Sequence, residues 1–367
     1  MLRIGYFGDG KWAVLALEKI LANPSIEVEY IVLRYKAPDA ELRRQADIYG
    51  IPCFTVKNVN DEEFLEKIRA YSVDINVSMS FDQILREGII HLAPMGFINC
   101  HAGALPFYRG RNILNWAIIN GEKEFGVTVH HVDEGIDTGD IILQRFAPIG
   151  RDDLYGDVLE RAQHLCAEAR HDALAMIESG EASRIPQASI HPAGFYCSGR
   201  TWGDEWIDWG WGSERIHNFV RGIAAPAPGA RTLLGETECI IDITETIENA
   251  PEYLDKPGAI VGKDSEGLTV KTGDSTIRVR RVLDAGTGEE IPIAKLRIGM
   301  RFSSRADGLG ELDMEDKAVI VVGAGGHAKV LLDTLLERGV KVIGFLEKDI
   351  RAGGGGQHPR NTGPGDG

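Results

Sequence analysis

In the first 150 residues, short apolar runs alternate with longer segments in which apolar residues recur at helical spacing. Short apolar runs such as LRIGYFG are typical of strands buried on both faces, whereas the longer segments between them repeat their apolar positions at helical spacing. The expected strands are residues 2–8, 28–33, 51–54, 74–78 and 96–100, and the expected helices run from the Gly8-Asp9-Gly10 turn to about Ile20, over 39–49 and 61–70, and through IIHLA. Strands that alternate with helices predict a doubly wound, mostly parallel sheet, in which ligands bind beyond the carboxyl ends of the strands.

The rest of the chain changes pattern twice. Residues 153–179 repeat apolar positions at helical spacing and end at Gly180, and a second helix is expected over 213–223. From residue 230 to about 302, short alternating runs separated by turns predict a small β-rich subdomain. Residues 317–349 then begin again with strand, Gly-rich turn, helix and strand, which indicates a partial second βαβ unit.

These patterns define the domain organisation that we expect for this α/β protein. The expected parts are a catalytic domain over 1–182, a linker with a helix over 183–229, a small β-rich C-terminal domain over 230–303, a partial βαβ segment over 304–350 and a tail over 351–367. The Gly-rich tail has too few apolar residues to pack a core, so we expect it to be disordered.

Composition restricts the partners and the cellular setting. The 367 residues are 43% hydrophobic, and 40 Lys and Arg against 55 Asp and Glu give a net charge of −15. Because phosphate backbones are bound through Lys and Arg, so negative a chain argues against a nucleic-acid partner. The 5 cysteines form no CxxC pair, no apolar run approaches the roughly 20 residues that span a membrane, and no signal peptide is recognisable. We therefore expect a cytoplasmic protein with reduced thiols.

Three polar residues carry the candidate chemistry. Asn99 and His101 are two positions apart after an apolar run, so in a strand both side chains point the same way, and Asp137 follows in the Gly-rich segment EGIDTGD. An amide, an imidazole and a carboxylate suit acyl transfer to an amine. The imidazole can take the proton that the amine loses, the amide can donate to the oxygen that becomes negative, and the carboxylate can hold the imidazole in one tautomer.

The spacing of these residues resembles the signature of the formyltransferases that use N10-formyltetrahydrofolate. The matching elements are Asn-x-His, LPxYRGR and GVTxHxxDxGxDTGDI, and the resemblance covers roughly residues 1–300. HAGxLPFYRGRNILNWA is most similar to the sugar N-formyltransferases of this superfamily. The resemblance implies that Asn99, His101 and Asp137 are catalytic. Many members have Ser where this chain has Gly103, a departure that weighs more against a methionyl-tRNA formyltransferase than against a sugar enzyme.

The same resemblance implies where the pterin ring of the folate binds. The family grips this ring with the loop after the fourth strand and with the segment that leads to the catalytic carboxylate. A flat heterocycle needs backbone donors and acceptors beside apolar walls. Taken alone, SMSFDQIL also reads as a helix entry capped by Ser or Asp. The expected cofactor-binding residues are Phe81, Asp82, Gln83, Ile84, Leu85, Val132, Asp133 and Gly135.

Two loops are candidates for contact with the acceptor substrate. The GDGKWA turn is either a tight turn or a substrate contact in which Lys11 meets a phosphate, and the basic loop YRGR is either a solvated surface feature or a phosphate or sugar contact. The first turn is not an NAD site, because Leu33-Arg34-Tyr35 offers no acidic ribose ligand. The expected substrate-binding residues are Gly10, Lys11 and Trp12 in the first loop and Tyr108, Arg109 and Arg111 in the second.

Two further groups of residues have a structural interpretation first. His130 and His131 are expected to be core or surface residues, and no Cys or His cluster has the spacing of metal ligands, so we expect no metal site. The 4 Trp residues between positions 202 and 211 are expected to pack, although stacking on a base would also suit them.

The hypothesis that unites these features is a sugar N-formyltransferase. It implies formyl transfer from N10-formyltetrahydrofolate to the amino group of a dideoxysugar linked to dTDP, UDP or GDP, in lipopolysaccharide or other surface-polysaccharide synthesis, by a homodimer. The alternatives are a methionyl-tRNA formyltransferase and a non-catalytic nucleotide-sugar binding protein. The latter is suggested by VxGAGGHAKV near the end of the chain, which resembles the opening of the N-terminal portion of sugar O- and N-acyltransferases.

Overall fold

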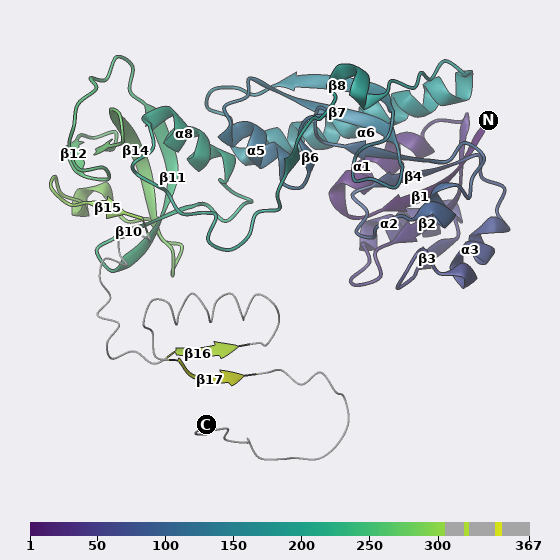
Figure 1. Ribbon diagram of the computed structural model, residues 1–367, viewed down its shortest axis with the longest axis horizontal. Helices are drawn as coiled ribbons and strands as arrows, with labels where there is room; N and C mark the ends of the chain where they lie inside the picture. Colours follow the sequence, from purple (N-terminus) through teal and green to yellow (C-terminus); the bar gives the residue numbers. More distant parts are fainter. Residues whose placement is uncertain (305–318, 323–341, 347–367) are drawn as a thin grey trace, which may run out of the picture. The chain divides into compact units, whose positions relative to one another are not determined.

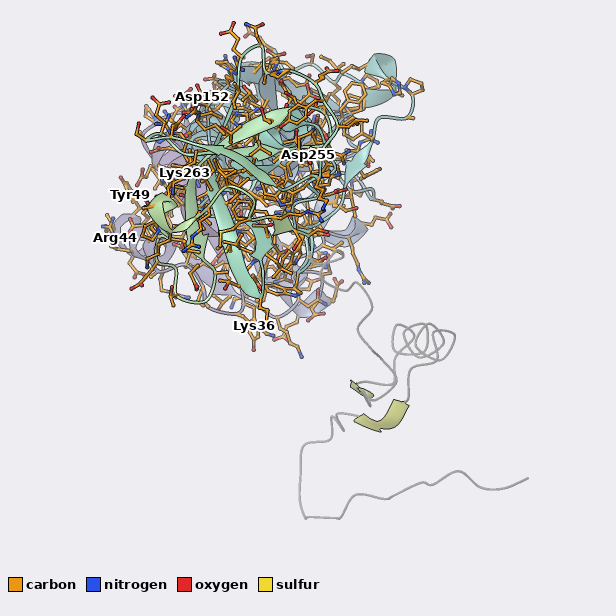
Figure 2. The ribbon with its side chains drawn as sticks, turned by 90° about the vertical axis from the view of Figure 1, so that its left-hand side faces the viewer. Lys36, Arg44, Tyr49, Asp152, Asp255 and Lys263 are labelled. Atoms are coloured by element: carbon orange, nitrogen blue, oxygen red, sulfur yellow. The ribbon has the colours of Figure 1, made fainter. Side chains whose placement is uncertain are left out.

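The computed structural model of the protein describes residues 1–304, 319–322 and 342–346. Its contacts divide the chain into two compact units, Met1–Gly308 and Leu309–Gly367, and each is described by itself. Figure 1 shows the chain with its elements labelled. Charged side chains such as those of Lys36, Arg44 and Lys263 lie on the outside (Figure 2).

The first half of the larger unit is built on a seven-stranded sheet in the order β3-β2-β1-β4-β5-β7-β8 (Figure 1). Strands β1 to β5 run parallel, and β7 and β8 continue the sheet antiparallel. The elements are β1 Leu2–Gly8, α1 Gly10–Leu21, β2 Ile26–Leu33, α2 Ala40–Tyr49, β3 Cys53–Thr55, α3 Glu62–Arg69, β4 Ile75–Met79, α4 Glu87–Ile90, β5 Phe97–His101, β6 Arg109–Gly110, α5 Ile113–Ile119, β7 Glu124–His131, β8 Ile141–Pro148 and α6 Tyr155–Ser179. The doubly wound, mostly parallel sheet expected from the sequence is confirmed.

Helices cover both faces of this sheet because its strands are apolar on both sides. Strand β1 shows the division: Ile4 and Tyr6 enter one core cluster with residues of α1, α2 and α6, whereas Phe7 enters a second cluster with residues of α3 and α4. Helix α2 shows how local chemistry sets element ends. The side chain of Asp39 accepts hydrogen bonds from the N–H groups of Glu41 and Leu42 at 2.9 Å, and Gly50 ends the helix at a φ of 66°.

The linker after α6 returns to the catalytic half, which the sequence pattern did not indicate. Its elements are α7 Gln187–Ile190 and β9 Tyr196–Cys197, before α8 Ser213–Gly222. Strand β9 pairs in parallel with β6, so that Arg109 lies opposite Tyr196 and Gly110 opposite Cys197. This pairing brings the linker to the basic loop that follows the candidate catalytic strand.

The C-terminal half of this unit is an antiparallel β-sheet, as expected. Its six strands have the order β12-β13-β14-β11-β10-β15, and α8 packs on β11. The elements are β10 Ala230–Leu234, β11 Thr237–Thr246, β12 Ile260–Lys263, β13 Leu268–Lys271, β14 Thr276–Asp284, a 3₁₀ turn Ile293–Lys295 and β15 Phe302–Ser303. In its core Trp209 stacks on Phe302 with ring centroids 5.5 Å apart, and the indole N–H donates to Thr232 Oγ1 at 2.9 Å.

The smaller unit contributes one pair of described strands. Strands β16 Val319–Val322 and β17 Val342–Leu346 pair in parallel, as the repeated βαβ pattern predicts. The expected Gly-rich turn and helix between them and the expected disordered tail lie outside the described residues. In the part of the chain that the structure describes, no helix is long and apolar enough to cross a membrane.

Two tryptophans of the Trp-rich segment predict losses of stability of different size on truncation. Trp209 is 2% exposed and Trp202 is 70% exposed. We expect Trp209→Ala to lower the free energy of unfolding by about 3–5 kcal/mol, because it leaves a cavity and removes the hydrogen bond from the indole to Thr232, whose hydroxyl keeps its bond to the Ser303 carbonyl. Trp202→Ala should change it by less than about 0.5 kcal/mol. Urea unfolding followed by circular dichroism measures both, and equal losses would contradict the burial difference.

Candidate active site

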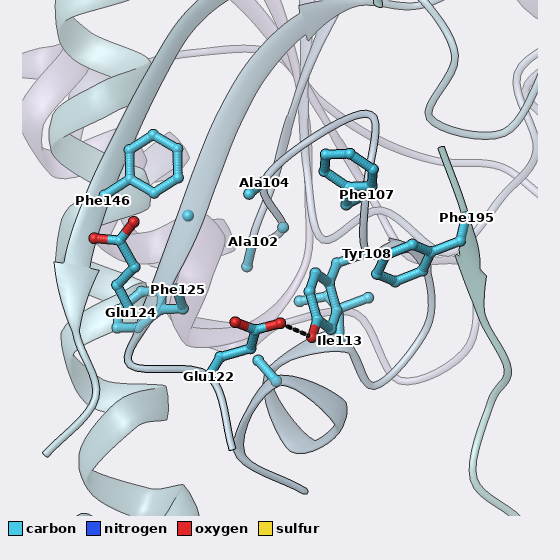
Figure 3. A pocket seen from close by; sticks show the side chains of 13 residues that line it. Ala102, Ala104, Phe107, Tyr108, Ile113, Glu122, Glu124, Phe125, Phe146 and Phe195 are labelled. Atoms are coloured by element: carbon cyan, nitrogen blue, oxygen red, sulfur yellow. Dashed lines mark hydrogen bonds between the residues drawn. The ribbon is translucent and has the colours of Figure 1, made fainter. Parts of the chain in front are cut away.

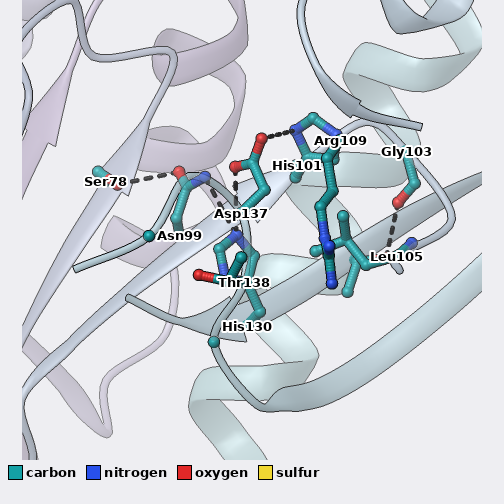
Figure 4. Close-up of polar contacts among 12 residues, drawn as sticks. Ser78, Asn99, His101, Gly103, Leu105, Arg109, His130, Asp137 and Thr138 are labelled. Atoms are coloured by element: carbon teal, nitrogen blue, oxygen red, sulfur yellow. Dashed lines mark hydrogen bonds and ion pairs between the residues drawn. The ribbon is translucent and has the colours of Figure 1, made fainter. Parts of the chain in front are cut away.

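Asn99 sits at the carboxyl end of β5 with its side chain oriented by a hydrogen bond. Ser78, at the end of the neighbouring strand β4, donates from Oγ to Asn99 Oδ1 at 2.9 Å (Figure 4). A hydroxyl can donate to the amide oxygen, so the amide nitrogen is left as the donor that faces the other way. That orientation makes Nδ2 available to an oxygen that becomes negative during reaction.

His101 lies between a carboxylate and a backbone carbonyl. Its Nδ1 is 3.6 Å from Asp137 Oδ2 (Figure 4). Its Nε2 is 2.6 Å from the carbonyl oxygen of Tyr108. A carbonyl only accepts, so Nε2 carries a hydrogen and Nδ1 is the nitrogen that can gain one. Proton uptake at Nδ1 places the new positive charge beside Asp137, which stabilises it.

The contact between His101 and Tyr108 requires Gly103. A Cβ atom added at Gly103 would lie 2.5 Å from the Tyr108 carbonyl oxygen and 2.6 Å from His101 Nε2. Both distances are shorter than a van der Waals contact, so the loop would have to move away from the imidazole. The departure from the Ser that many family members carry therefore coincides with a tight imidazole-to-carbonyl hydrogen bond in this chain.

Both the side chain and the backbone of Asp137 accept hydrogen bonds. Its Oδ2 accepts from the N–H of Gly110 at 3.0 Å, and Gln187 Nε2 donates to its carbonyl oxygen at 2.8 Å. The residue has a φ of 55°, a left-handed conformation that the Gly-rich EGIDTGD turn permits and that non-glycine residues adopt uncommonly. These contacts leave the carboxylate a defined position beside His101.

His130 belongs to the same site, a position that the sequence left open. It is 2% exposed, lies opposite Asn99 in the β5–β7 ladder, and has its Nε2 3.8 Å from Asp137 Oδ1 and 3.4 Å from Asn99 Nδ2. Its Nδ1 is 2.7 Å from the carbonyl of His131 and so carries the hydrogen. Burial lowers the pKa of His130 to about 4, against an opposing effect of Asp137, so the ring is neutral near pH 7. The sequence predicts core or surface positions for both histidines of β7; the structure instead places His130 beside Asn99 and Asp137.

Beneath Ser78 lies a buried cation. Arg170 of α6 is 0% exposed and donates from Nη2 to the Ser78 carbonyl oxygen. Within the described part of the chain, its Nε and Nη1 have no hydrogen-bond partner. Burying a guanidinium with unpaired N–H groups lowers stability. The hydrogen bond from Arg170 to Ser78 nevertheless holds the end of the strand that orients Asn99.

A cavity of about 530 Å³ opens beside this group of residues. It contains the catalytic candidates Asn99 and Asp137, and its walls combine apolar side chains with backbone and carboxylate groups, the mixture that a pterin ring needs. Gln83 shapes the wall, since its side chain accepts from the N–H of Val59 and donates to the carbonyl of Val56. Every residue expected to bind the cofactor lines this cavity: Phe81, Asp82, Gln83, Ile84, Leu85, Val132, Asp133 and Gly135.

The residues expected to contact the acceptor lie in different parts of the structure. Arg111 lines the 530 Å³ cavity, and among the described residues its guanidinium has no ion-pair partner. Arg109 is buried instead, with Nε and Nη2 donating to Gln187 Oε1 at 3.1 and 2.7 Å, so it supports the residue that holds Asp137. Tyr108 lies in a second cavity of about 360 Å³, where its hydroxyl donates to Glu122 at 2.6 Å (Figure 3).

The first loop, Gly10 to Trp12, begins α1 and does not line the cavity beside Asp137. Lys11 is exposed and Trp12 packs against the core. The loop is linked to the cofactor wall through Arg34, whose Nη2 is 2.5 Å from Asp9 and whose Nε is 3.3 Å from Asp82. Contact of this loop with a substrate stays a prediction.

Comparison with known proteins places this geometry in a family. Residues 12–174 match the formyl transferase family model and residues 201–301 match the formyl transferase C-terminal domain. The methionyl-tRNA formyltransferase of Halothermothrix orenii is 31% identical over 297 residues, which cover 78% of this chain and 93% of that protein. Residues 318–359 match the PglD N-terminal domain.

Solved structures show the same fold. WlaRD, a sugar 3N-formyl transferase solved in the presence of dTDP and 5-N-formyl-THF, aligns with a TM-score of 0.59 and 22% identity over 76% of this chain and 98% of that chain. The N-formyltransferase from Helicobacter canadensis, in complex with folinic acid and dTDP-3-aminofucose, gives a TM-score of 0.57 and 22% identity over 76% and 99%.

The chain belongs to the formyltransferase family. Its family is therefore one of enzymes that transfer a formyl group.

The lowered pKa of His130 predicts a pH dependence of stability. An unfolded His titrates near 6.5, so between pH 6.5 and 4 the unfolded chain binds more protons than the folded one, and stability is lost as the pH falls through this window. His130→Gln removes this contribution. Between pH 7 and pH 5 we expect the variant to lose about 1–2 kcal/mol less unfolding free energy than the wild type. Urea unfolding at both pH values measures it, and equal losses would contradict the assignment.

The contact between Ser78 and Asn99 predicts a kinetic effect. Asn99→Ala should lower kcat by about 10²–10³-fold, as loss of an oxyanion donor does in other enzymes. Ser78→Ala frees the amide to rotate and should lower kcat by about tenfold with little change in KM for the formyl donor. The double variant should be no slower than Asn99→Ala, because Ser78 acts through Asn99. Additive losses in kcat would show that Ser78 acts independently.

Proposed function

We propose that the protein transfers the formyl group to the amino group of a nucleotide-linked amino-dideoxysugar. The observation that carries this proposal is Arg111, a cation without an ion-pair partner among the described residues, in the same cavity as Asn99 and Asp137. The chain carries 15 more acidic than basic residues, so a local positive charge suits a small phosphorylated acceptor better than a long polyanion. The RGR loop and Gly103 agree with the resemblance to sugar enzymes.

The residues of the site divide the chemistry among them. The proposed donor is N10-formyltetrahydrofolate. The acceptor amine attacks its formyl carbon and loses a proton, a new C–N bond forms, the bond between the formyl carbon and N10 breaks, and tetrahydrofolate leaves with a proton on N10. His101 Nδ1 takes that proton, and Asp137 stabilises the resulting imidazolium. Asn99 Nδ2 donates to the formyl oxygen as it gains negative charge. His130 stays neutral and, with Ser78, confines the amide of Asn99.

The proposal also includes the setting of the reaction. We place the enzyme in the cytoplasm as a homodimer that supplies surface-polysaccharide synthesis, since nucleotide-linked amino sugars are activated donors for glycan assembly. The walls formed by Phe81 to Leu85 and Val132 to Gly135 are the proposed pterin site. The nucleotide, whether dTDP, UDP or GDP, and the position of the amino group are variables of the experiment below.

A second candidate function is formylation of methionyl-tRNA. It is favoured by the relative from Halothermothrix orenii and by those from Porphyromonas gingivalis and other bacteria, which carry that name at about 30% identity. A tRNA partner requires Lys and Arg spread over a broad surface to meet phosphates. The net charge of −15 opposes that requirement, so we give the sugar acceptor preference.

A direct assay distinguishes the two acceptors. The protein is incubated with N10-formyltetrahydrofolate and either a panel of dTDP-, UDP- and GDP-amino-dideoxysugars or methionyl-tRNA, and products are measured by mass. We expect one sugar to gain a single formyl group. His101→Ala should lower kcat by about 10³-fold or more, because it removes the proton acceptor beside the oxyanion donor.

Three other outcomes would overturn the proposal in different ways. Formylation of methionyl-tRNA alone would assign the second function. Equal rates for wild type and His101→Ala would remove the imidazole from the mechanism. Tight nucleotide-sugar binding with no formylation of any acceptor would point to a non-catalytic binding protein.

A further inference from the structure

A third cavity lies next to the catalytic one, and neither the catalytic triplet nor the cofactor wall uses it. Its volume is about 390 Å³. It is formed where the linker meets the starts of α5 and α6 and the segment after α8. The lining that matters for its chemistry is Asn112, Tyr155, Arg200, Trp202, Pro226 and Pro228.

Residues that adjoin in the chain line the two cavities, on both the catalytic loop and the linker. Arg111 and Gly199 line the catalytic cavity, and the residues that follow them, Asn112 and Arg200, line the third. The N–H of Arg200 donates to Asn112 Oδ1 at 2.9 Å, which holds the two segments together at the junction. Gly110, whose N–H binds Asp137, is only two residues before Asn112, a span of about 7 Å in extended chain.

The walls of the third cavity suit a flat, partly polar ring. Trp202 is 70% exposed, and the guanidinium of Arg231 lies 5.1 Å from its ring centroid, which restrains the indole without covering it fully. The rings of Pro226 and Pro228 add apolar wall. At the edge, Asn112 offers amide groups, and the Tyr155 hydroxyl has no hydrogen-bond partner among the described residues. A nucleobase presents an aromatic face with donors and acceptors on its edge, so it matches these groups.

Two arginines, Arg111 and Arg200, lie where the linings of the two cavities meet in the chain. Neither Arg111 nor Arg200 forms an ion pair within residues 1–304, 319–322 and 342–346, although acidic residues outnumber basic ones along the chain. Arg200 is held in place, with its guanidinium 5.5 Å from the Trp116 ring centroid and Nη2 donating to the Asp204 carbonyl at 2.7 Å. The carboxylates of Asp204 and Glu205 act on Arg200 without forming an ion pair with it, and Glu205 also lines the third cavity. Guanidinium groups that form no ion pair favour phosphate oxygens.

We propose that the third cavity binds the nucleobase and ribose of the nucleotide carrier, with Trp202 as the stacking surface and Arg111 and Arg200 as the contacts of the diphosphate. This inference rests on the proposed function and adds the subsite that would recognise the carrier. The amino sugar then extends through the junction toward Asn99 and His101, while the cofactor occupies the wall on the other side of Arg111. In this proposal the nucleotide is bound in a different cavity from the one that contains Asn99 and Asp137.

The test uses free nucleotides as well as the reaction. Binding of dTDP, UDP and GDP to the full chain is measured by calorimetry for the wild type, Trp202→Leu and Arg200→Gln. The matched control is Tyr49→Leu, which removes an aromatic side chain that is 58% exposed at the end of α2 (Figure 2). We expect one nucleotide to bind, its Kd to rise about tenfold or more in Trp202→Leu and in Arg200→Gln, and the control to match the wild type.

Kinetics with the formylated sugar complete the test. Trp202→Leu should raise KM for the nucleotide sugar by about tenfold with kcat and KM for the formyl donor unchanged, while its circular dichroism melting curve matches the wild type. Sugar formylation with no effect of Trp202→Leu on Kd or KM would overturn the subsite and leave the proposed function intact. Nucleotide binding that depends on Trp202, without sugar formylation, would support the subsite and reject the function. No nucleotide binding to the wild type, or a Trp202 effect on methionyl-tRNA alone, would overturn the subsite.

Discussion

The carboxylate of Asp137 is the group on which the geometry of the site depends. It lies 3.6 Å from His101 and 3.8 Å from His130, and it accepts the N–H of Gly110. A charge so enclosed needs partners on several sides, because burial without them is costly. Each partner comes from a different segment, so a single carboxylate couples β5, β7, the basic loop and the EGIDTGD turn. Its backbone is in turn held by Gln187, which Arg109 supports.

The residues that position Asn99 include a buried charge, Arg170, whose desolvation is unfavourable. Ser78 gives its hydroxyl to the amide oxygen, and Arg170, fully buried under the sheet, gives one N–H to the Ser78 carbonyl and leaves two nitrogens unpaired. An apolar residue at 170 would pack there without that desolvation cost. The arrangement is understandable if the position of the amide nitrogen matters more than stability, as expected where a donor must meet a developing negative charge.

The linker is a functional part of the site rather than a tether. By pairing β9 with β6 it closes one side of the catalytic cavity, and by continuing through Arg200 to Trp202 it forms a side of the adjoining cavity. Gly110 of β6 binds the carboxylate beside His101, and the proposed recognition residues Arg200 and Trp202 follow β9, so both parts are connected through this pair of strands. A substrate whose reactive amine is separated from its recognised base by a diphosphate fits an arrangement of this kind.

Sequence alone determined the architecture and most of the candidate chemistry. The alternation of buried strands and amphipathic helices predicted the doubly wound sheet, because apolar period is set by local geometry. The two-residue spacing of Asn99 and His101 placed them at one strand end, and the family resemblance selected cofactor residues that the structure gathers around one cavity. The prediction of the sheet is confirmed because it depends on neighbours in the chain, whereas the cofactor role of the cavity residues stays a prediction.

Only the tertiary structure decided which side chains meet across distant segments. His130 or His131 could have faced the site; the antiparallel register of β7 on β5 chose His130. Arg109 and Arg111 look alike in sequence, yet pairing with β9 buries the first on Gln187 and leaves the second in the cavity. Arg170 read as part of an ordinary helix, and its reach to Ser78 appears only when α6 lies against the sheet. Local periodicity fixes the face of an element, whereas partners brought from far along the chain depend on register and packing.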